Sequence, residues 1–381
     1  MREGVSVLIF ISIAFIVATS GCLKMMGVTQ EELEELGLSE SPFFSFLAGG
    51  VKKKVVTPEK KIEAPKYVGM DILLIEYPKS IIPGSIFDMT VVIGNNYYGS
   101  TAGNVVLTVR FPPGFNISVV DAATQNITLL PEGNPNVAVI KYDKIDYNEG
   151  DVITLTVKAP PREVTGSIRD FWKIDFSLTY WYSTFTRLTT RITSTSYYRN
   201  ILGVENITPI EVKRMAGELS IYPELEKIGR GPIKIPDSVF GGGGLSFPKV
   251  FTFRFSNDGK GIVLGNVTFY FIGIRREGFI TTEILTGAGI WKEADRKDLQ
   301  KLSSLGLEMA HRMLLDSMSA GYPIYKAEVS PWRKKIVLPV NMKDISSSLK
   351  NTLTEFPVLL LAVYQYEIDR TIYILMEKQG I

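Results

Sequence analysis

Alternating apolar and polar positions dominate the chain from residue 67 onward. In segment 152–159, Ile153, Leu155 and Val157 occupy one set of alternate positions, and mainly threonine and lysine occupy the other. A two-residue period places the two sets on opposite faces of a β-strand, with the apolar set buried. Similar segments between glycine, proline and asparagine turns predict further strands at 70–77, 87–94, 104–111 and 138–142, with a closing pair of strands within 174–194.

A second run of strand-like segments begins near Gly217. It predicts strands at 219–222, 250–256, 266–274 and 335–340, with a closing pair of strands within 358–376. One interruption has a helical period instead, with apolar residues that recur at spacings of three and four; they are Leu299, Leu302, Leu305, Met309 and Met313. The pattern predicts a single helix over 293–320, whose apolar stripe either covers the second unit or remains exposed for a partner.

Short strands at regular intervals are typical of all-β sandwiches. We therefore predict an all-β fold of two tandem immunoglobulin-like β-sandwiches, at 67–200 and 217–381, joined by a linker at 201–216. The second contains the inserted α-helix. The strand at 87–96 followed by Gly103-Asn104-Val105 is echoed by the strand at 251–259 followed by Gly265-Asn266-Val267, which indicates an internal duplication.

The first unit carries a family resemblance. Its Pro83-Gly84 start, a strand ending in Asn95-Asn96, the Ala102-Gly103-Asn104-Val105 segment and the Phe111-Pro112-Pro113-Gly114-Phe115 exit resemble CARDB and S-layer-associated immunoglobulin-like repeats of prokaryotic, notably archaeal, surface proteins. The resemblance implies a spacer or adhesive module without a catalytic centre. The second unit departs from the pattern by its helix and by the loop Gly241-Gly242-Gly243-Gly244.

The first residues have the pattern of an export signal. Arg2 precedes an apolar run over 5–18, which leads to Thr19-Ser20-Gly21-Cys22. This ending resembles a lipoprotein signal, which implies removal of residues 1–21 and a lipid on Cys22. The alternative is an uncleaved anchor over 5–23, although this run is short for a membrane-spanning helix. Either outcome places the remaining chain outside the cytoplasm and against a membrane.

Residues 22–66 read as a tether. Thr29 and Glu32 form a capping box, and Gly37 is a stop signal, so we expect one short helix between them. A phenylalanine cluster at 43–46 and the lysines at 52–54 either meet the bilayer interface or dock on the first sandwich.

Composition narrows the function. The 381 residues carry a formal charge of only +2, and no long basic run interleaves with aromatic residues, so we expect no nucleic-acid partner. With a single cysteine the chain forms no internal disulfide. Four Asn-x-Ser/Thr sequons, candidates for N-glycosylation, agree with an exposed surface protein; they begin at Asn116, Asn126, Asn206 and Asn266.

Catalytic and metal motifs are weak. The sole histidine, His311, follows Glu308 by three residues, but a carboxylate-bridged metal bundle needs a second such pair. A packing or surface role is the expectation, and we expect no cofactor. Oxygen ligands suited to Ca²⁺ cluster within nine residues, although a polar turn explains them better; they are Asp143, Asp146, Asn148 and Asp151.

Aromatic residues crowd segment 171–185. Alternation directs one set to the core and leaves Trp181 and Phe185 on the opposite face. With Trp172 they form a candidate binding surface for carbohydrate or protein, and packing against the neighbouring domain is the alternative.

Together these patterns predict a lipid-anchored, non-enzymatic structural or adhesion module of the cell surface. We expect protein or glycan partners, with self-association as a further option. A ligand-capturing lipoprotein for carbohydrate, peptide or a transporter is the alternative. A hydrolase with an unmarked carboxylate pair ranks last.

Overall fold

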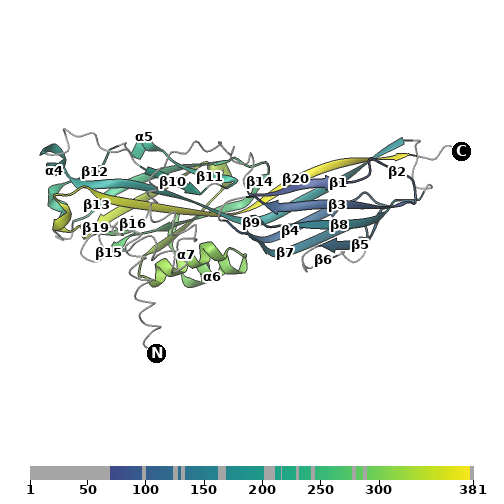
Figure 1. Cartoon of the computed structure of the whole chain (residues 1–381). Coiled ribbons are helices and arrows are strands. Elements are labelled where there is room, and N and C mark those ends of the chain that lie inside the picture. Colours follow the sequence, from purple (N-terminus) through teal and green to yellow (C-terminus); the bar gives the residue numbers. More distant parts are fainter. Residues whose placement is uncertain are drawn as a thin grey trace, which may run out of the picture.

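The computed structural model describes residues 69–96, 100–122, 128–129, 134–161, 169–200, 211–215, 217–228, 231–241, 245–276, 280–285 and 290–377. Most of these residues lie in strands, so the predicted all-β sandwich class is confirmed (Figure 1). The predicted signal, Cys22 and the tether lie outside the described residues. Within the described part of the chain, no helix is long and apolar enough to cross a bilayer.

The first sandwich has a four-stranded outer sheet in the order β1 (Met70–Glu76), β3 (Ile86–Asn95), β8 (Gly150–Lys158) and β5 (Asn116–Ala122). Its facing layer contains β4 (Ala102–Arg110), β7 (Val137–Ile145) and β6 (Thr128–Leu129). In β8, Ile153, Leu155 and Val157 are fully buried, as the alternation predicts. The short strand β2 (Ser80–Ile81) pairs in parallel with the end of β20 (Thr354–Glu377).

The second sandwich has a five-stranded outer sheet in the order β11 (Leu219–Pro223), β13 (Phe247–Asn257), β19 (Lys335–Lys343), β16 (Ile280–Ile284) and β15 (Arg275–Arg276). Its facing layer contains β14 (Ile262–Ile272), β18 (Ile324–Val329) and β17 (Trp291–Glu293). Short helices lie between strands; they are α4 (Thr195–Asn200), α5 (Leu225–Ile228), η4 (Asp237–Val239), η5 (Pro331–Arg333) and η6 (Ser347–Leu349).

One eleven-stranded sheet supplies the facing layer of both sandwiches. Its centre is β9 (Arg169–Ser194), which pairs with the whole length of β20, from Ile192 opposite Thr354 to Arg169 opposite Glu377. This antiparallel register has no bulge, and at about 3.3 Å per residue the pair is roughly 80 Å long. Figure 1 shows the two strands running through both halves of the elongated molecule.

The prediction of a closing pair of strands inside each unit is wrong. Segments 174–194 and 358–376 each lie within a single strand, and the two strands pair with each other. The physical reason is the absence of turn residues: β9 contains no glycine, proline or asparagine, and β20 contains only Pro357. The predicted linker also contains a strand, β10 (Glu211–Met215), which extends the shared sheet beside β9 together with β12 (Ile233–Ile235). The division into units at 67–200 and 217–381 stays a prediction.

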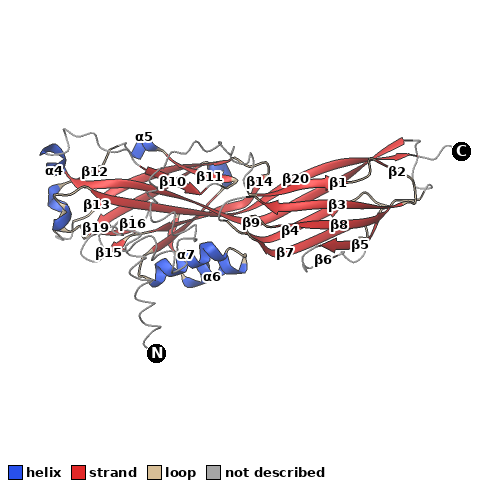
Figure 2. Cartoon of the chain, in the orientation of Figure 1, coloured by secondary structure: helices blue, strands red, loops and turns tan. Residues whose placement is uncertain are grey.

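The predicted single helix over 293–320 is two helices. They are α6 (Arg296–Ser304), which begins at a capping box between Asp295 and Asp298, and α7 (Glu308–Ser319). Gly306 separates them with a φ of +74°, a conformation that ends a right-handed helix. Both helices lie together on one side of the strand layers (Figure 2).

The helices cover the outer face of the shared sheet. Leu299, Leu302 and Leu314 are buried there against Phe185 of β9 and Leu361 of β20. The apolar stripe therefore has a structural role, and burial of this surface, at about 25 cal/mol per Å², stabilises the second sandwich.

The turn between α6 and α7 also contacts the first sandwich. The side-chain amide of Asn104 in β4 donates a hydrogen bond to the Ser304 carbonyl at 3.2 Å, and Lys144 lies 3.7 Å from Glu308. Gly103 is packed so closely that a Cβ there would lie 1.9 Å from the Leu305 carbonyl oxygen. The helical insertion thus joins the two sandwiches.

We expect Gly103→Ala to lower the free energy of unfolding by about 1–3 kcal/mol, because the added methyl group forces the helical turn away from β4. Urea denaturation of the full chain measures the change. The matched control is Gly231→Ala, since a Cβ at Gly231 meets nothing within 4 Å. Equal unfolding midpoints for the two variants would contradict the close contact.

Candidate functional site

Four tyrosines mark the junction of the two sandwiches. Tyr182 and Tyr180 of β9 lie opposite Tyr364 and Tyr366 of β20, and all four side chains are fully buried. The ring centroids of the cross-strand pairs are 6.3 Å apart for Tyr182 and Tyr364 and 5.8 Å apart for Tyr180 and Tyr366. On β9, pairing with β4 ends at Trp181, four residues before pairing with β10 begins. The tyrosines therefore define the place where one sandwich gives way to the other.

A buried acid lies among these tyrosines. Glu218, immediately before β11, accepts hydrogen bonds from the hydroxyls of Tyr180 at 2.5 Å and Tyr364 at 2.9 Å. Burial disfavours its ionised form and raises its pKa to about 7, although the tyrosine hydrogen bonds act in the opposite direction. A Cβ at Gly69 would lie 1.7 Å from a Glu218 carboxylate oxygen, so the first described residue of the first sandwich packs directly on this acid.

Charged groups add a second connection at the junction. Asp71 of β1 is 6% exposed and binds Lys260, in the turn before β14, at 2.6 Å. It also binds Arg370 of β20 at 2.9 Å. Because Asp71 belongs to the first sandwich and Lys260 to the second, this cluster resists separation of the two, and its low exposure limits screening by salt.

Glu218 predicts a defined pH dependence of stability. An acid whose pKa is raised from 4.5 to about 7 on folding stabilises the fold most below pH 4.5, and this contribution is lost as the pH rises to 7. We expect the wild-type free energy of unfolding to fall by up to about 3 kcal/mol across this window, relative to Glu218→Gln. Urea denaturation at pH 5 and pH 8 measures the difference. Parallel pH profiles for the two proteins would refute the assignment.

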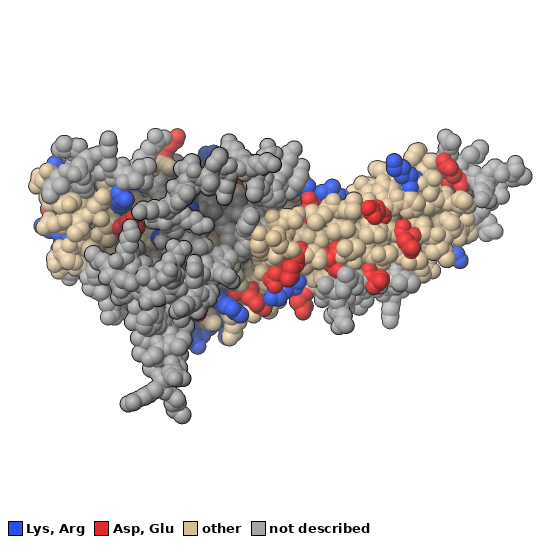
Figure 3. Space-filling view, viewed as in Figure 1, with Lys and Arg blue, Asp and Glu red and all other residues tan. Residues whose placement is uncertain are grey.

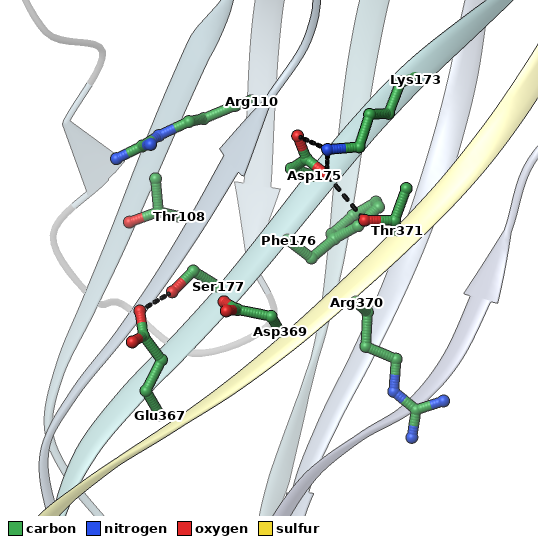
Figure 4. Close-up of a pocket in the computed structure, with 10 residues that line it drawn as sticks. All are labelled: Thr108, Arg110, Lys173, Asp175, Phe176, Ser177, Glu367, Asp369, Arg370 and Thr371. Atoms are coloured by element: carbon green, nitrogen blue, oxygen red, sulfur yellow. Dashed lines mark hydrogen bonds and ion pairs between the residues drawn. The ribbon is translucent and has the colours of Figure 1, made fainter. Parts of the chain in front are cut away.

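A polar groove lies on the outer face of the shared sheet in the first sandwich. It crosses β4, β9 and β20 and has a volume of about 380 Å³. Figure 4 shows its lining side chains arrayed along the three strands. They are Thr108, Arg110, Lys173, Asp175, Phe176, Ser177, Glu367, Asp369, Arg370 and Thr371. Because β9 alternates, Asp175 and Ser177 face the groove while Ile174 and Leu178 are buried in the core.

Internal hydrogen bonds hold several groove side chains in place. The Thr371 hydroxyl donates to Asp175 at 2.7 Å, and Lys173 lies 2.9 Å from the same carboxylate. These contacts, first the hydrogen bond from Thr371 and then the one from Lys173, lower the pKa of Asp175 below its ordinary value. The Ser177 hydroxyl donates to Glu367 at 2.6 Å. A lowered pKa suits a carboxylate that accepts hydrogen bonds and not a general acid.

Charged side chains outside the groove are dispersed on the visible face of the first sandwich. On the face seen in Figure 3, acidic side chains are scattered over the first sandwich with single basic side chains between them. The groove is a candidate site because it is concave and is lined by charged and hydroxyl side chains.

The predicted aromatic surface is wrong. Phe185 is 3% exposed beneath α6 and α7, and Trp181 is half-buried against the same helices. Trp172 is half-buried in the first sandwich with its ring 5.5 Å from that of Phe115. The alternative of packing therefore describes these side chains. The exposed aromatic residues of this region are Phe171 and, on β20, Tyr373.

Two of the four candidate Ca²⁺ ligands, Asp146 and Asp151, have separate side-chain partners. Asp146 accepts a hydrogen bond from Thr101 and pairs with Lys144, whereas Asp151 is buried and accepts one from Tyr142. Asn148 and Asp143 are exposed, and Asn148 adopts a left-handed turn with a φ of 59°. Among the described residues, no group of three or more His, Cys, Asp or Glu side chains is placed to hold a metal ion.

The candidate glycosylation sites and the remaining predicted residues lie partly within and partly outside the described residues. Asn116 and Asn266 are exposed, so a glycan could reach either one. Asn126 and Asn206 lie outside the described residues, as does Cys22. His311 is half-buried on α7. Glu218 was not predicted, since its only signal in the sequence is an acid between Gly217 and a strand. The groove was not predicted either, because its residues come from three distant segments.

Comparisons with known proteins give little guidance to function. No protein-family model matches the chain. No characterised protein sequence matches it either. Similar solved structures include a cohesin–dockerin complex of Clostridium thermocellum, with 15% identity, 30% of this chain and 81% of that chain covered, and a TM-score of 0.25.

Two further solved structures match a larger share of this chain. The pilus backbone RrgB of Streptococcus pneumoniae is 8% identical, with 80% of this chain and 91% of that chain covered and a TM-score of 0.23. The MSCRAMM ACE of Enterococcus faecalis, described as binding its ligands by a collagen hug, is 9% identical, with 83% and 97% covered and a TM-score of 0.20. These scores are too low to carry an argument about function, which must come from the residues themselves.

Proposed function

We propose that this chain is a membrane-anchored, non-enzymatic structural or adhesion module on the outer side of the cell membrane. The observation that carries the proposal is the uninterrupted pairing of β9 with β20 through both sandwiches. A module that transmits position or force across its length needs domains held at a fixed angle. Two sandwiches joined by a flexible linker lack that property, because inter-domain motion is then the default.

Three further contacts support rigidity. They are the tyrosine and Glu218 cluster, the Asp71 ion pairs, and the helical turn that packs against Gly103. Each joins residues of one sandwich to residues of the other, and each uses buried or closely packed groups. None of the three resembles an arrangement for bond-breaking chemistry.

Support for the proposed membrane anchor comes from the sequence. A lipid on Cys22 would hold the chain to the membrane and would leave the sandwiches outside the cytoplasm. The lipoprotein signal and the resemblance to CARDB repeats together favour an archaeal type of surface protein. The exposed sequons at Asn116 and Asn266 would then be available for glycosylation, and partners at the surface would be proteins or glycans.

The groove favours a second function, that of a ligand-capturing surface lipoprotein. Its hydrogen-bonded side chains form a site that is arranged before a ligand arrives. The groove gives little support to the third option, a hydrolase, which needs one carboxylic acid that donates a proton. The lowered pKa of Asp175 favours its ionised form, and Glu367 accepts a hydrogen bond from Ser177.

Rigidity can be measured with two spin labels. We expect labels at Lys141→Cys on β7 and Val337→Cys on β19, both exposed positions, to give one narrow distance distribution in the full chain carrying Cys22→Ser. Double electron–electron resonance provides the measurement. Labels at Lys141→Cys and Lys158→Cys, both within the first sandwich, supply the reference width. A much broader distribution across the junction would refute a fixed arrangement.

The anchor is tested by intact mass. We expect the chain extracted from membranes of its native host to lack residues 1–21 and to carry the added mass of lipid on Cys22. Any mass on peptides containing Asn116 or Asn266 would report a glycan. A mature chain that retains Met1 would contradict the lipoprotein assignment and support the uncleaved anchor.

A further inference from the structure

We propose that the polar groove across β4, β9 and β20 is a binding site for a neutral oligosaccharide. The inference deepens the proposed surface function, on which it rests. The groove's volume of about 380 Å³ falls within the range of small-ligand sites. Its floor is formed by regular strands, so its shape is set by the sheet and not by loops.

Two exposed aromatic residues extend the groove at one end. Tyr373 of β20 pairs with Lys173 of the groove and is 58% exposed, while Phe171, two residues further along β9, is 73% exposed. Strand parity places both on the same face as Asp175 and Thr371. Because exposure of large aromatic rings costs solvation free energy, a pair beside a polar hollow indicates a contact surface. A sugar ring offers an apolar face to such rings and hydroxyls to the groove beyond them.

The polar groups of the groove suit hydroxyls. Within the described residues, no hydrogen bond engages the guanidinium of Arg110 or the carboxylate of Asp369, and both side chains are exposed. Arg110 can donate several hydrogen bonds and Asp369 can accept several, which is the combination that recognises a polyol. Figure 4 shows both groups on the groove side of their strands, whereas Arg370 is directed away, toward its partner Asp71.

Charge selects a neutral ligand over an anionic one. Three basic residues, Arg110, Lys173 and Arg370, and three acidic residues, Asp175, Glu367 and Asp369, line the groove, so its formal charges balance. Lys173 is moreover occupied by Asp175. A balanced groove offers no net attraction to a phosphate-rich or sulfated ligand, whereas its hydrogen-bonding groups suit a neutral oligosaccharide.

The experiment uses the full chain in detergent and isothermal titration with neutral oligosaccharides of four to six units, built from glucose, mannose, galactose or N-acetylglucosamine. We expect at least one to bind, and Tyr373→Ala and Asp369→Ala each to weaken that binding about tenfold. The matched control is Trp332→Ala, which removes an 86% exposed aromatic ring on the second sandwich and should leave binding unchanged. All three positions are exposed, so the unfolding midpoints should stay equal.

Failure of the panel to bind would overturn the inference, as would binding that all three variants retain. Loss of binding on Trp332→Ala alone would place the site elsewhere and would also overturn it. If an acidic or basic peptide library binds through Tyr373 and Asp369 while the sugars do not, the groove is a protein site and the oligosaccharide assignment is wrong. The spin-label distances across the junction are independent of these outcomes, so a failed sugar site can be distinguished from a failed structural role.

Discussion

The backbone ladder between β9 and β20 is the interaction on which the rest of the structure depends. In most tandem sandwich proteins each domain closes its own sheets, and a few residues of linker determine how the domains lie. Here the two strands belong to both sandwiches, so bending at the junction would require breaking inter-strand hydrogen bonds. Each such bond that is left unsatisfied in a buried position costs about 1–3 kcal/mol, so bending is opposed far more strongly than it would be by a linker.

Side chains at the junction give this ladder its alignment. The tyrosine rings fill the core where one facing sheet ends and the other begins, and the hydroxyls of Tyr180, Tyr364 and Tyr366 donate hydrogen bonds to Glu218 or Asn257. A buried carboxylate is costly unless hydrogen-bonded, so Glu218 admits few alternative arrangements of its neighbours. Gly69 and Gly259 complete the cluster, since a side chain at either position would collide with the glutamate. The junction therefore specifies one relation between the sandwiches.

Much of the fold follows from alternation in the sequence, and the remaining parts show where alternation stops being informative. The pattern identified the buried face of β8 because a strand covered on one side reveals its own period. It identified neither the pairing of β9 with β20 nor the groove, since a strand's period says which face is buried but not which strand lies beside it. The break at Gly306 was not predicted, because a single glycine is compatible with a continuous helix as well as with a helix end. Only the structure shows that Gly306 packs closely against Gly103. The position of Glu218 between Gly217 and a strand could not reveal its role, because its hydrogen-bond partners are tyrosines 38 and 146 residues away.

The position of Gly69 determines where the chain enters the folded part of the molecule. This residue packs against Glu218 in the middle of the long axis, and β1 departs from there toward the tip where β2 meets the end of β20. A chain segment that enters the sandwiches at Gly69 is therefore attached to the middle of the long axis and not to either end. Both ends of the long axis therefore lie away from the point at which the chain enters the sandwiches.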